Sequence, residues 1–269
     1  MMQTDIIKPL RAVAGMVYIV GAGPGAVDLL TLRALDRIQR AEVVVHDRLI
    51  TPEVLALIPQ AAVRTYVGKA LGNHSVPQEG IHALLVQHAR AGRCVVRLKG
   101  GDPYVFGRGG EEVQALQAAG IAFEVVPGVT AAGGCAAAAG IPLTHRDFSN
   151  SCVFLTGHEA DGNAPPDWAA LARPGQTRVF YMGVQRLAQI ARQLIAHGLS
   201  PDTPAAIVSD GTRPSQQVVA TELHALVAQA PLYGPRPGLL IIGETVRLSP
   251  DFRPVARCHH ALEPVHHES

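Results

Sequence analysis

The chain has 269 residues, of which 48% are hydrophobic and 17% charged, and its formal net charge is +1. A chain of this length and apolar content can bury one large or two medium-sized cores. The nearly balanced charge gives no overall electrostatic attraction to nucleic acid, so we expect no nucleic-acid partner.

The chain begins with a predicted strand at 16–20 that leads into a glycine loop. Residues 11–25 superficially resemble the basic and apolar parts of a secretory signal, but their apolar core enters the loop without a cleavage site. No segment reaches the ~20 apolar residues that a membrane span needs. We therefore expect a first strand here and no membrane partner.

The glycine loop Gly21–Ala26 matches the pattern G-x-G-x-x-A that is typical of nicotinamide dinucleotide binding. Asp47 follows the second predicted strand, where an acid that binds the ribose belongs. However, Pro24 and Gly25 prolong the turn, and the expected helix cap, Asp28, stands further on. This spacing weakens the placement of a pyrophosphate on the helix N-terminus. A nicotinamide-dependent oxidoreductase thus stays open as an alternative.

Strand-like and helix-like segments alternate along the chain. In the first half we expect strands at 16–20, 42–46, 94–98 and 123–126, and helices at 28–39, 77–91 and 111–119. Asn73 and Ser75 are possible caps of the second helix. A turn-rich segment at 140–147 precedes a second α/β set at 152–156, 177–181, 187–196, 205–208, 222–228 and 239–242. Such alternation predicts crossovers and mainly parallel or mixed sheets.

The segment 97–112 concentrates glycine and charge directly behind a predicted buried strand. Gly100 and Gly101 let the backbone approach a ligand closely, and Asp102 offers an acceptor. Glu111 and Glu112 open the next helix, so the segment has the layout of a small-molecule site in an α/β sheet. The alternative is an ordinary glycine-rich surface turn, although such a turn has no use for Arg108.

The four cysteines, at positions 94, 135, 152 and 258, form no C-x-x-C pair. This spacing argues against a zinc site and against a compact disulfide framework, so we expect no metal and reduced thiols in a cytoplasmic protein. The histidines at 259, 260, 266 and 267 stand in a tail to which we assign no role.

Several motifs occur together in one order, and together they resemble the tetrapyrrole methylase family. The resemblance extends from about Val17 to about Val246. The motifs are Gly21–Gly25, Asp28–Ala34, Val67–Lys69, Leu98–Pro103, Phe106–Gly109, Val126–Ala131, Gly140–Arg146, Tyr181–Gly183 and Ile241–Glu244.

The resemblance implies two α/β domains with S-adenosyl-L-methionine bound in a cleft between them, in a homodimer. We expect an N-terminal tail at 1–14, a first domain at 15–145, a second at 146–250 and a flexible tail at 251–269. The first strand begins at Met16, so we expect no additional module that oxidises the product or inserts iron, and methylation alone.

The reaction implied is C-methylation of uroporphyrinogen III at C2 and C7, which gives precorrin-2 for sirohaem, cobalamin or haem d1 synthesis. A sister methyltransferase acting on a later precorrin and a non-catalytic tetrapyrrole carrier remain alternatives. The resemblance requires no metal.

Family position also implies the residues that contact the cofactor. Their types suit this role, because small residues leave room, Asp102 can accept a hydrogen bond and a Met thioether can pack on adenine. Gly211 stands where relatives are expected to have alanine, and Ala26 and Val27 replace an expected Asp-Pro. The implied contacts are Pro24, Gly100, Gly101, Asp102, Val105, Thr130, Ala131, Met182 and Gly211.

A substrate with eight carboxylates requires cationic partners, and arginine can hold a carboxylate through two hydrogen bonds. We expect substrate contacts from Arg48, Lys69, His74 and Arg146, with solvated surface charges as the alternative. Arg108 and Glu111 are the predicted catalytic residues. A guanidinium is a poor general base, so Arg108 is expected to orient the substrate and stabilise charge, with Glu111 as its ionic partner.

Overall fold

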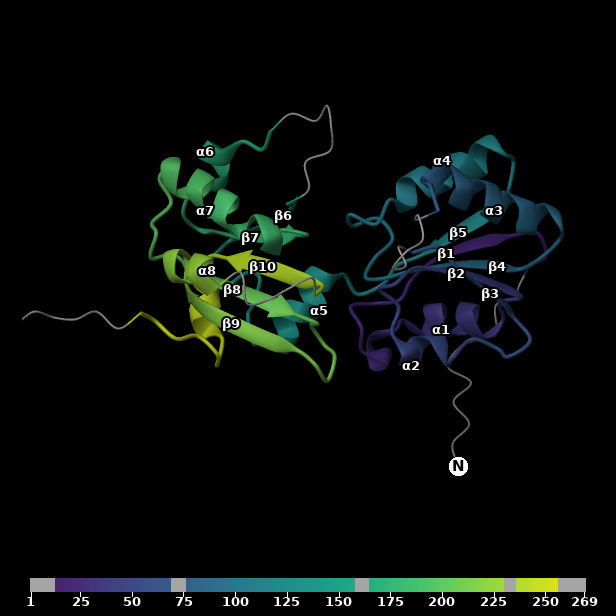
Figure 1. The fold of residues 1–269 in the computed structure, drawn as a ribbon, viewed down its shortest axis with the longest axis horizontal. Coiled ribbons are helices and arrows are strands. Elements are labelled where there is room, and N and C mark those ends of the chain that lie inside the picture. The colour runs from purple at the N-terminus through teal and green to yellow at the C-terminus, as the bar shows by residue number, and fades with distance from the viewer. Residues whose placement is uncertain (1–12, 69–75, 158–164, 230–235, 256–269) are drawn as a thin grey trace, which may run out of the picture.

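The computed structural model describes residues 13–68, 76–157, 165–229 and 236–255. They form two halves that lie side by side, each built on one five-stranded sheet with helices on both of its faces (Figure 1). The first half ends with the strand at 123–126, and the second sheet begins at residue 151.

The first sheet is entirely parallel and has the strand order β3-β2-β4-β1-β5. Parallel strands are buried on both faces, which explains the continuous apolar runs of the central strands. The strands are β1 (Val17–Gly21), β2 (Val43–His46), β3 (Val63–Tyr66), β4 (Val95–Lys99) and β5 (Phe123–Val126).

Helices cover both faces of this sheet (Figure 1). Ile38 of α1 (Leu32–Gln39) and Val54 of α2 (Pro52–Leu55) belong to the core on one face. Leu85 of α3 (Gln78–Arg90) and Leu116 of α4 (Gly109–Ala118) belong to the core on the other. The alternation of strand and helix thus produced the predicted parallel layer.

The second sheet is mixed, with the order β6-β7-β10-β8-β9. Only β6 and β7 run parallel, whereas β10 is antiparallel to β7 and β8, and β9 is antiparallel to β8. The strands are β6 (Ser151–Thr156), β7 (Gln176–Tyr181), β8 (Pro204–Ser209), β9 (Gln217–Glu222) and β10 (Gly238–Ile242).

One face of the second sheet packs against α6 (Trp168–Leu171), α7 (Leu187–Ala196) and α8 (Leu223–Gln229). The opposite face packs against α5 (Ala131–Ala138) and the 3-10 turn η4 (Glu244–Leu248). Helix α5 lies at the junction of the two halves (Figure 1). The predicted domain boundary after 145 stays a prediction, although the packing of α5 on the second sheet favours a boundary near 127–130.

Some predicted elements differ from the observed ones. The helix expected at 28–39 is divided into the 3-10 turn η1 (Val27–Leu29) and α1, because Leu30 and Thr31 have extended backbone. The Thr31 hydroxyl accepts a hydrogen bond from Ala34 N at 3.1 Å and caps α1. The predicted caps Asn73 and Ser75 lie outside the described residues.

The predicted C-terminal tail is attached to the sheet at its start. Arg253 N donates to the carbonyl of Ala220 at 2.9 Å, and Phe252 forms a bridge with the same residue. Residues 256–269, with Cys258 and the four tail histidines, lie outside the described part, as do residues 1–12 of the predicted N-terminal tail. Among the described residues, no helix is both long and apolar enough to cross a membrane.

Candidate active site

The loops at the carboxyl ends of the neighbouring strands β1, β4 and β5 contact one another through three glycines, Gly21, Gly101 and Gly128. We call this contact the glycine junction. A Cβ atom on Gly21 would lie 2.6 Å from Gly128 N and 2.7 Å from the Gly101 carbonyl oxygen. Gly101 has φ +68° and exchanges backbone hydrogen bonds with Gly23, at 2.7 and 3.2 Å. The loops can therefore meet only without side chains at Gly21 and Gly128, while the positive φ of Gly101 favours glycine there.

Asp102 fastens this junction through both of its carboxylate oxygens. Asp102 Oδ1 accepts from Tyr104 N at 2.8 Å, and Oδ2 accepts from Gly128 N at 3.1 Å. A carboxylate oxygen has a second lone pair, so Asp102 retains capacity to accept from a ligand. The residue thus holds the loop after β4 to the loop after β5 at the edge of the site.

The predicted cofactor residues gather around α5. A Cβ on Gly134 would lie 2.5 Å from Pro24 Cγ, and one on Gly101 would lie 3.6 Å from Ala131 N. Gly211 packs directly on Cys135, with no room for a side chain of its own. Three predicted contacts, Pro24, Gly101 and Gly211, thus lie against one short helix, whose first residue is the predicted contact Ala131. Gly211 fits this position better than the alanine expected in relatives.

Tyr181, at the end of β7, connects α5 to the second sheet. Its hydroxyl lies 2.5 Å from Thr130 Oγ1 and accepts from Ala132 N at 3.0 Å. Burial raises the pKa of the Tyr181 hydroxyl. We did not predict this residue, although it stands in the motif that contains Met182.

We expect Tyr181→Phe to lower the free energy of unfolding by about 1 kcal/mol, because Ala132 N loses its acceptor inside the protein. Loss of the contact to Thr130 is also expected to weaken cofactor binding. Urea unfolding and calorimetric titration measure the two effects. Tyr104→Phe, at a tyrosine that is 58% exposed, is the control and should change stability by less than about 0.5 kcal/mol. Equal stability of the two variants would contradict the prediction.

An open cavity of about 740 Å³ lies beside this junction and takes its lining from both halves. Several lining side chains are large, apolar and accessible: Tyr104 is 58% exposed, Phe106 41% and Met182 51%. The rings of Phe106 and Tyr181 are in contact, with centroids 4.9 Å apart. The lining residues are Tyr104, Phe106, Arg108, Gly109, Gly110, Glu111, Thr156 and Met182. A cavity of this size can hold an extended organic ligand.

Three residues of this lining have left-handed backbone that is unusual for non-glycine residues. The φ values are +51° at Phe106, +59° at Arg108 and +54° at Met182. Such conformations cost free energy and occur where the surrounding structure enforces them, often at functional sites. Here they turn the three side chains around one cavity.

Arg108 and Glu111 form a two-point ion pair in the cavity wall. Arg108 Nε donates to Glu111 Oε1 at 2.8 Å, and Nη2 donates to Oε2 at 2.6 Å. This pairing raises the pKa of Arg108 and lowers that of Glu111. The predicted contact between the two residues is therefore confirmed. The raised pKa also disfavours Arg108 as a proton acceptor.

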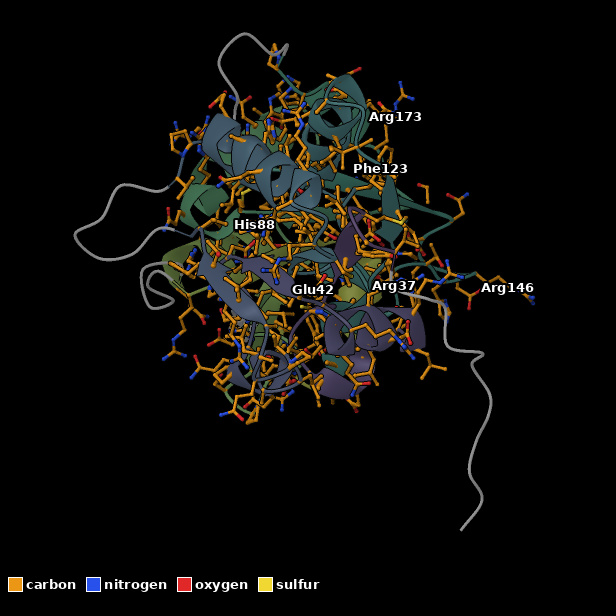
Figure 2. All side chains as sticks on the ribbon, turned by 90° about the vertical axis from the view of Figure 1, so that its right-hand side faces the viewer. Arg37, Glu42, His88, Phe123, Arg146 and Arg173 are labelled. Atoms are coloured by element: carbon orange, nitrogen blue, oxygen red, sulfur yellow. The ribbon has the colours of Figure 1, made fainter. Side chains whose placement is uncertain are left out.

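The predicted substrate residues do not lie together in one place, unlike the predicted cofactor residues around α5. Arg48 is exposed in the loop after β2, and that loop touches the site because a Cβ on Gly100 would lie 2.9 Å from Leu49 Cβ. Arg146 is exposed and projects away from the body of the protein (Figure 2). Neither belongs to the lining of the open cavity. Lys69 and His74 lie outside the described residues.

The predicted cofactor contact Val105 is half-buried in the loop after β4, where its N–H donates to the Asp102 carbonyl at 3.3 Å.

A buried ion network that we did not predict lies beneath this loop. Glu112 is fully buried, and its Oε1 accepts from Arg97 Nε at 2.9 Å and Lys99 Nζ at 3.0 Å. Burial, followed by the nearby Arg97 charge, lowers the pKa of Lys99. The network connects the end of β4 to the first turn of α4, which carries Glu111.

The strand order argues against nicotinamide binding at the glycine loop. In the dinucleotide-binding fold, the loop after the first strand and the acid after the second lie on adjacent strands. Here β4 lies between β1 and β2. Asp47 accepts from Leu49 N at 2.9 Å and lies 3.6 Å from Arg97, so it closes its own turn.

Comparison with known proteins finds related sequences and folds over most of the chain. The family model of Tetrapyrrole (Corrin/Porphyrin) Methylases matches residues 16–227. A siroheme synthase of Acinetobacter baylyi is 54% identical over 248 residues, which cover 92% of this chain and 54% of that protein. A siroheme synthase 1 of Klebsiella pneumoniae is 53% identical over 92% of this chain and 52% of its own length. The chain thus spans about half the length of the curated relatives it matches.

Solved structures match this chain over nearly their full length. Uroporphyrin III C-methyl transferase from Thermus thermophilus is 44% identical, with a TM-score of 0.74, over 87% of this chain and 99% of that one. The same values hold for that enzyme complexed with S-adenyl homocysteine. A cobalt precorrin-4 methyltransferase is 29% identical with a TM-score of 0.76, over 86% of this chain and 96% of its own.

Proposed function

Because this chain belongs to the tetrapyrrole methylase family, we propose that it transfers methyl groups from S-adenosyl-L-methionine to carbon atoms of uroporphyrinogen III. One structural observation carries the proposal. The loop after β4 and residues Thr156 and Met182 of the second half line one open cavity of about 740 Å³ next to the glycine junction. The product of two transfers, at C2 and C7, is precorrin-2.

The residues around α5 fit the methyl donor. S-Adenosyl-L-methionine supplies an electrophilic methyl group on a sulfonium when bound. A Cβ on Gly101 would meet nothing closer than 3.6 Å, so there is space beside its backbone, whereas Gly100 and Gly211 pack closely on Leu49 and Cys135. Asp102 can accept from a hydroxyl or an ammonium group. Thr130, Ala131, Pro24, Val105 and Met182 complete the proposed contact set. No metal is needed, since alignment and exclusion of water suffice for an in-line transfer.

The cavity supplies the position of the macrocycle. Tyr104, Phe106 and Met182 present apolar surface for the rings, while Arg108 can hold a carboxylate from the cavity wall. Arg108 acts by orientation and charge, because its pairing with Glu111 raises its pKa. Arg48, Lys69, His74 and Arg146 are proposed for the other carboxylates.

An anaerobic incubation with uroporphyrinogen III and S-adenosyl-L-methionine tests the function. Mass analysis of the tetrapyrrole should show two added methyl groups, and omission of the methyl donor should show none. If the protein binds S-adenosyl-L-methionine but does not methylate uroporphyrinogen III, the substrate would instead be a later precorrin. Absence of any binding of S-adenosyl-L-methionine would overturn the proposal.

Three finer points belong to the same proposal. Siroheme synthases among the relatives favour a supply of precorrin-2 to sirohaem, and the same product can also serve cobalamin or haem d1. A homodimer is the proposed assembly, which size-exclusion chromatography with light scattering checks. A cytoplasmic location stays a prediction from the cysteine spacing.

A further inference from the structure

The loop at 210–216 is tied firmly to its own half of the protein. Thr212 N donates to Gln216 Oε1 at 2.7 Å, and Gln216 Nε2 donates to the Ala138 carbonyl at the end of α5, at 3.2 Å. Gly211, within the loop, packs on Cys135 of the same helix. The loop therefore has a fixed position relative to α5 and the second sheet.

From this position, two side chains of the loop reach across to the first half. Thr212 Oγ1 accepts from Ala26 N at 3.0 Å, at the end of the glycine loop. Arg213 Nη2 donates to the Leu49 carbonyl at 2.8 Å, in the loop after β2. The Arg213 side chain is only 24% exposed. These contacts join segments that are 164 and 186 residues apart in sequence.

The glycine loop is shaped to receive this contact. Gly25 has φ +151°, and a Cβ there would lie 2.9 Å from both Cγ and Nε of Arg213. On its other side, the Gly25 carbonyl accepts from the buried Thr51 hydroxyl at 3.1 Å. Gly25 thus lies between Thr51 and Arg213, and its lack of a side chain admits the arginine.

The backbone of the 210–216 loop is strained. Asp210 has φ +49° and Thr212 has φ +67°. A positive φ is especially costly for a β-branched residue such as threonine, and glycine would adopt it without penalty. Such strain is found where other contacts of the residue offset it, and the Thr212 hydroxyl is the group that can supply one here. The hydrogen bond to Ala26 N is the contact that this hydroxyl makes.

We propose that Thr212 and Arg213 are positioning residues that clasp the 210–216 loop onto the glycine loop and thereby set the width of the cofactor site. This inference rests on the proposed function. Thr212 follows the proposed cofactor residue Gly211, and Ala26 stands two residues after the proposed cofactor residue Pro24. The contacts of Thr212 and Arg213, which we call the clasp, therefore fix the position of Gly211 in the second half relative to that of Pro24 in the first half. Loss of the clasp leaves the 210–216 loop and the glycine loop free to separate, and this weakens binding of the cofactor.

The test is calorimetric titration with S-adenosylhomocysteine alongside thermal unfolding of the full chain. Thr212→Gly removes the hydroxyl and relieves the strain, so we expect affinity to fall about fivefold or more. The melting temperature should change little, because relief of the backbone strain opposes the loss of the hydrogen bond and the greater freedom of glycine in the unfolded chain. Arg213→Met keeps much of the apolar stem and loses the donor, with a similar loss of affinity expected. Thr212→Ser keeps the hydroxyl and should bind within about twofold of the parent protein.

Arg247→Met is the matched control, because Arg247 pairs with Glu244 inside the second half at 2.7 Å. It should leave affinity unchanged. Parent-like affinity in both Thr212→Gly and Arg213→Met would overturn the clasp, as would an affinity that falls only in proportion to a lower melting temperature. Failure of the parent protein itself to bind S-adenosylhomocysteine would overturn the proposed function and the clasp with it.

Discussion

Glu112→Ala is expected to lower the free energy of unfolding by about 3–5 kcal/mol, the usual cost of removing one partner from a buried ion pair. Both Arg97 and Lys99 bond to Glu112 Oε1, and their side chains are each only 5% exposed. Without the carboxylate, two buried cations would face each other with little water to solvate them. The lowered pKa of Lys99 already reflects this burial and the nearby Arg97 charge.

Urea unfolding followed by circular dichroism measures this loss. Glu112→Gln should fall between the parent protein and Glu112→Ala, because an amide oxygen still accepts hydrogen bonds but carries no charge. The matched control is Glu244→Ala, since Glu244 forms a 2.7 Å pair with Arg247 at the surface, with 43% of each side chain exposed. Removal of an exposed pair should cost less than about 1 kcal/mol. Equal losses for Glu112→Ala and Glu244→Ala would show that the network is dispensable.

Apolar pattern alone was enough to locate most of the sheet strands. The run Val43–His46 is buried on both faces, as a parallel central strand requires, and it was predicted closely. By contrast, β3 was not predicted, because it is an edge strand in which Val63 is 50% and Tyr66 42% exposed. Helix α5 was also not predicted. Its sequence AAGGCAAA contains two helix-destabilising glycines and has no polar face. Tertiary packing on the second sheet accompanies its helical conformation, and a local pattern does not predict such packing.

For the site, local motifs predicted contacts that are close in sequence, and tertiary structure supplied the others. Arg108 is the residue directly before α4 and Glu111 lies in its first turn, so the two residues of this pair are only three positions apart in sequence. No local pattern shows that the Tyr181 hydroxyl meets Thr130, which lies 51 residues away. Likewise, the arrival of Thr212 at Ala26 depends on how the two sheets pack through α5. Sequence therefore predicted the parts of the site better than the connections between them.

Removal of the Arg108 side chain is expected to lower kcat for methyl transfer by about 100-fold or more, the usual cost of losing a preorganised charged group that holds the reacting molecule. The variant of choice is Arg108→Gly, because Arg108 has φ +59° and glycine adopts this backbone without strain. Arg108→Lys should also be impaired, since an ammonium group cannot reproduce the two-point contact of a guanidinium. Single-turnover methylation of uroporphyrinogen III, followed by mass analysis, measures these rates.

Glu111→Gln distinguishes the two possible roles of Arg108. The carboxylate holds the guanidinium through bonds of 2.8 and 2.6 Å, and this pairing raises the pKa of Arg108 above its already high ordinary value. If Arg108 acts as an oriented cation, its proton remains bound throughout the working pH range. The pH–rate profiles of the parent protein and of Glu111→Gln should then have the same shape, with a lower plateau in the variant. A profile whose basic arm shifts to lower pH in Glu111→Gln would instead identify Arg108 as the group that gains and loses the proton.

Cofactor binding separates loss of chemistry from loss of the site. Arg108 lines the open cavity and is not among the proposed cofactor contacts around α5, so Arg108→Gly should bind S-adenosylhomocysteine as the parent protein does. Weak methylation with full cofactor affinity would place Arg108 on the macrocycle side of the reaction. A parallel loss of cofactor affinity would contradict this assignment, and an unchanged methylation rate would remove Arg108 from the catalytic residues altogether.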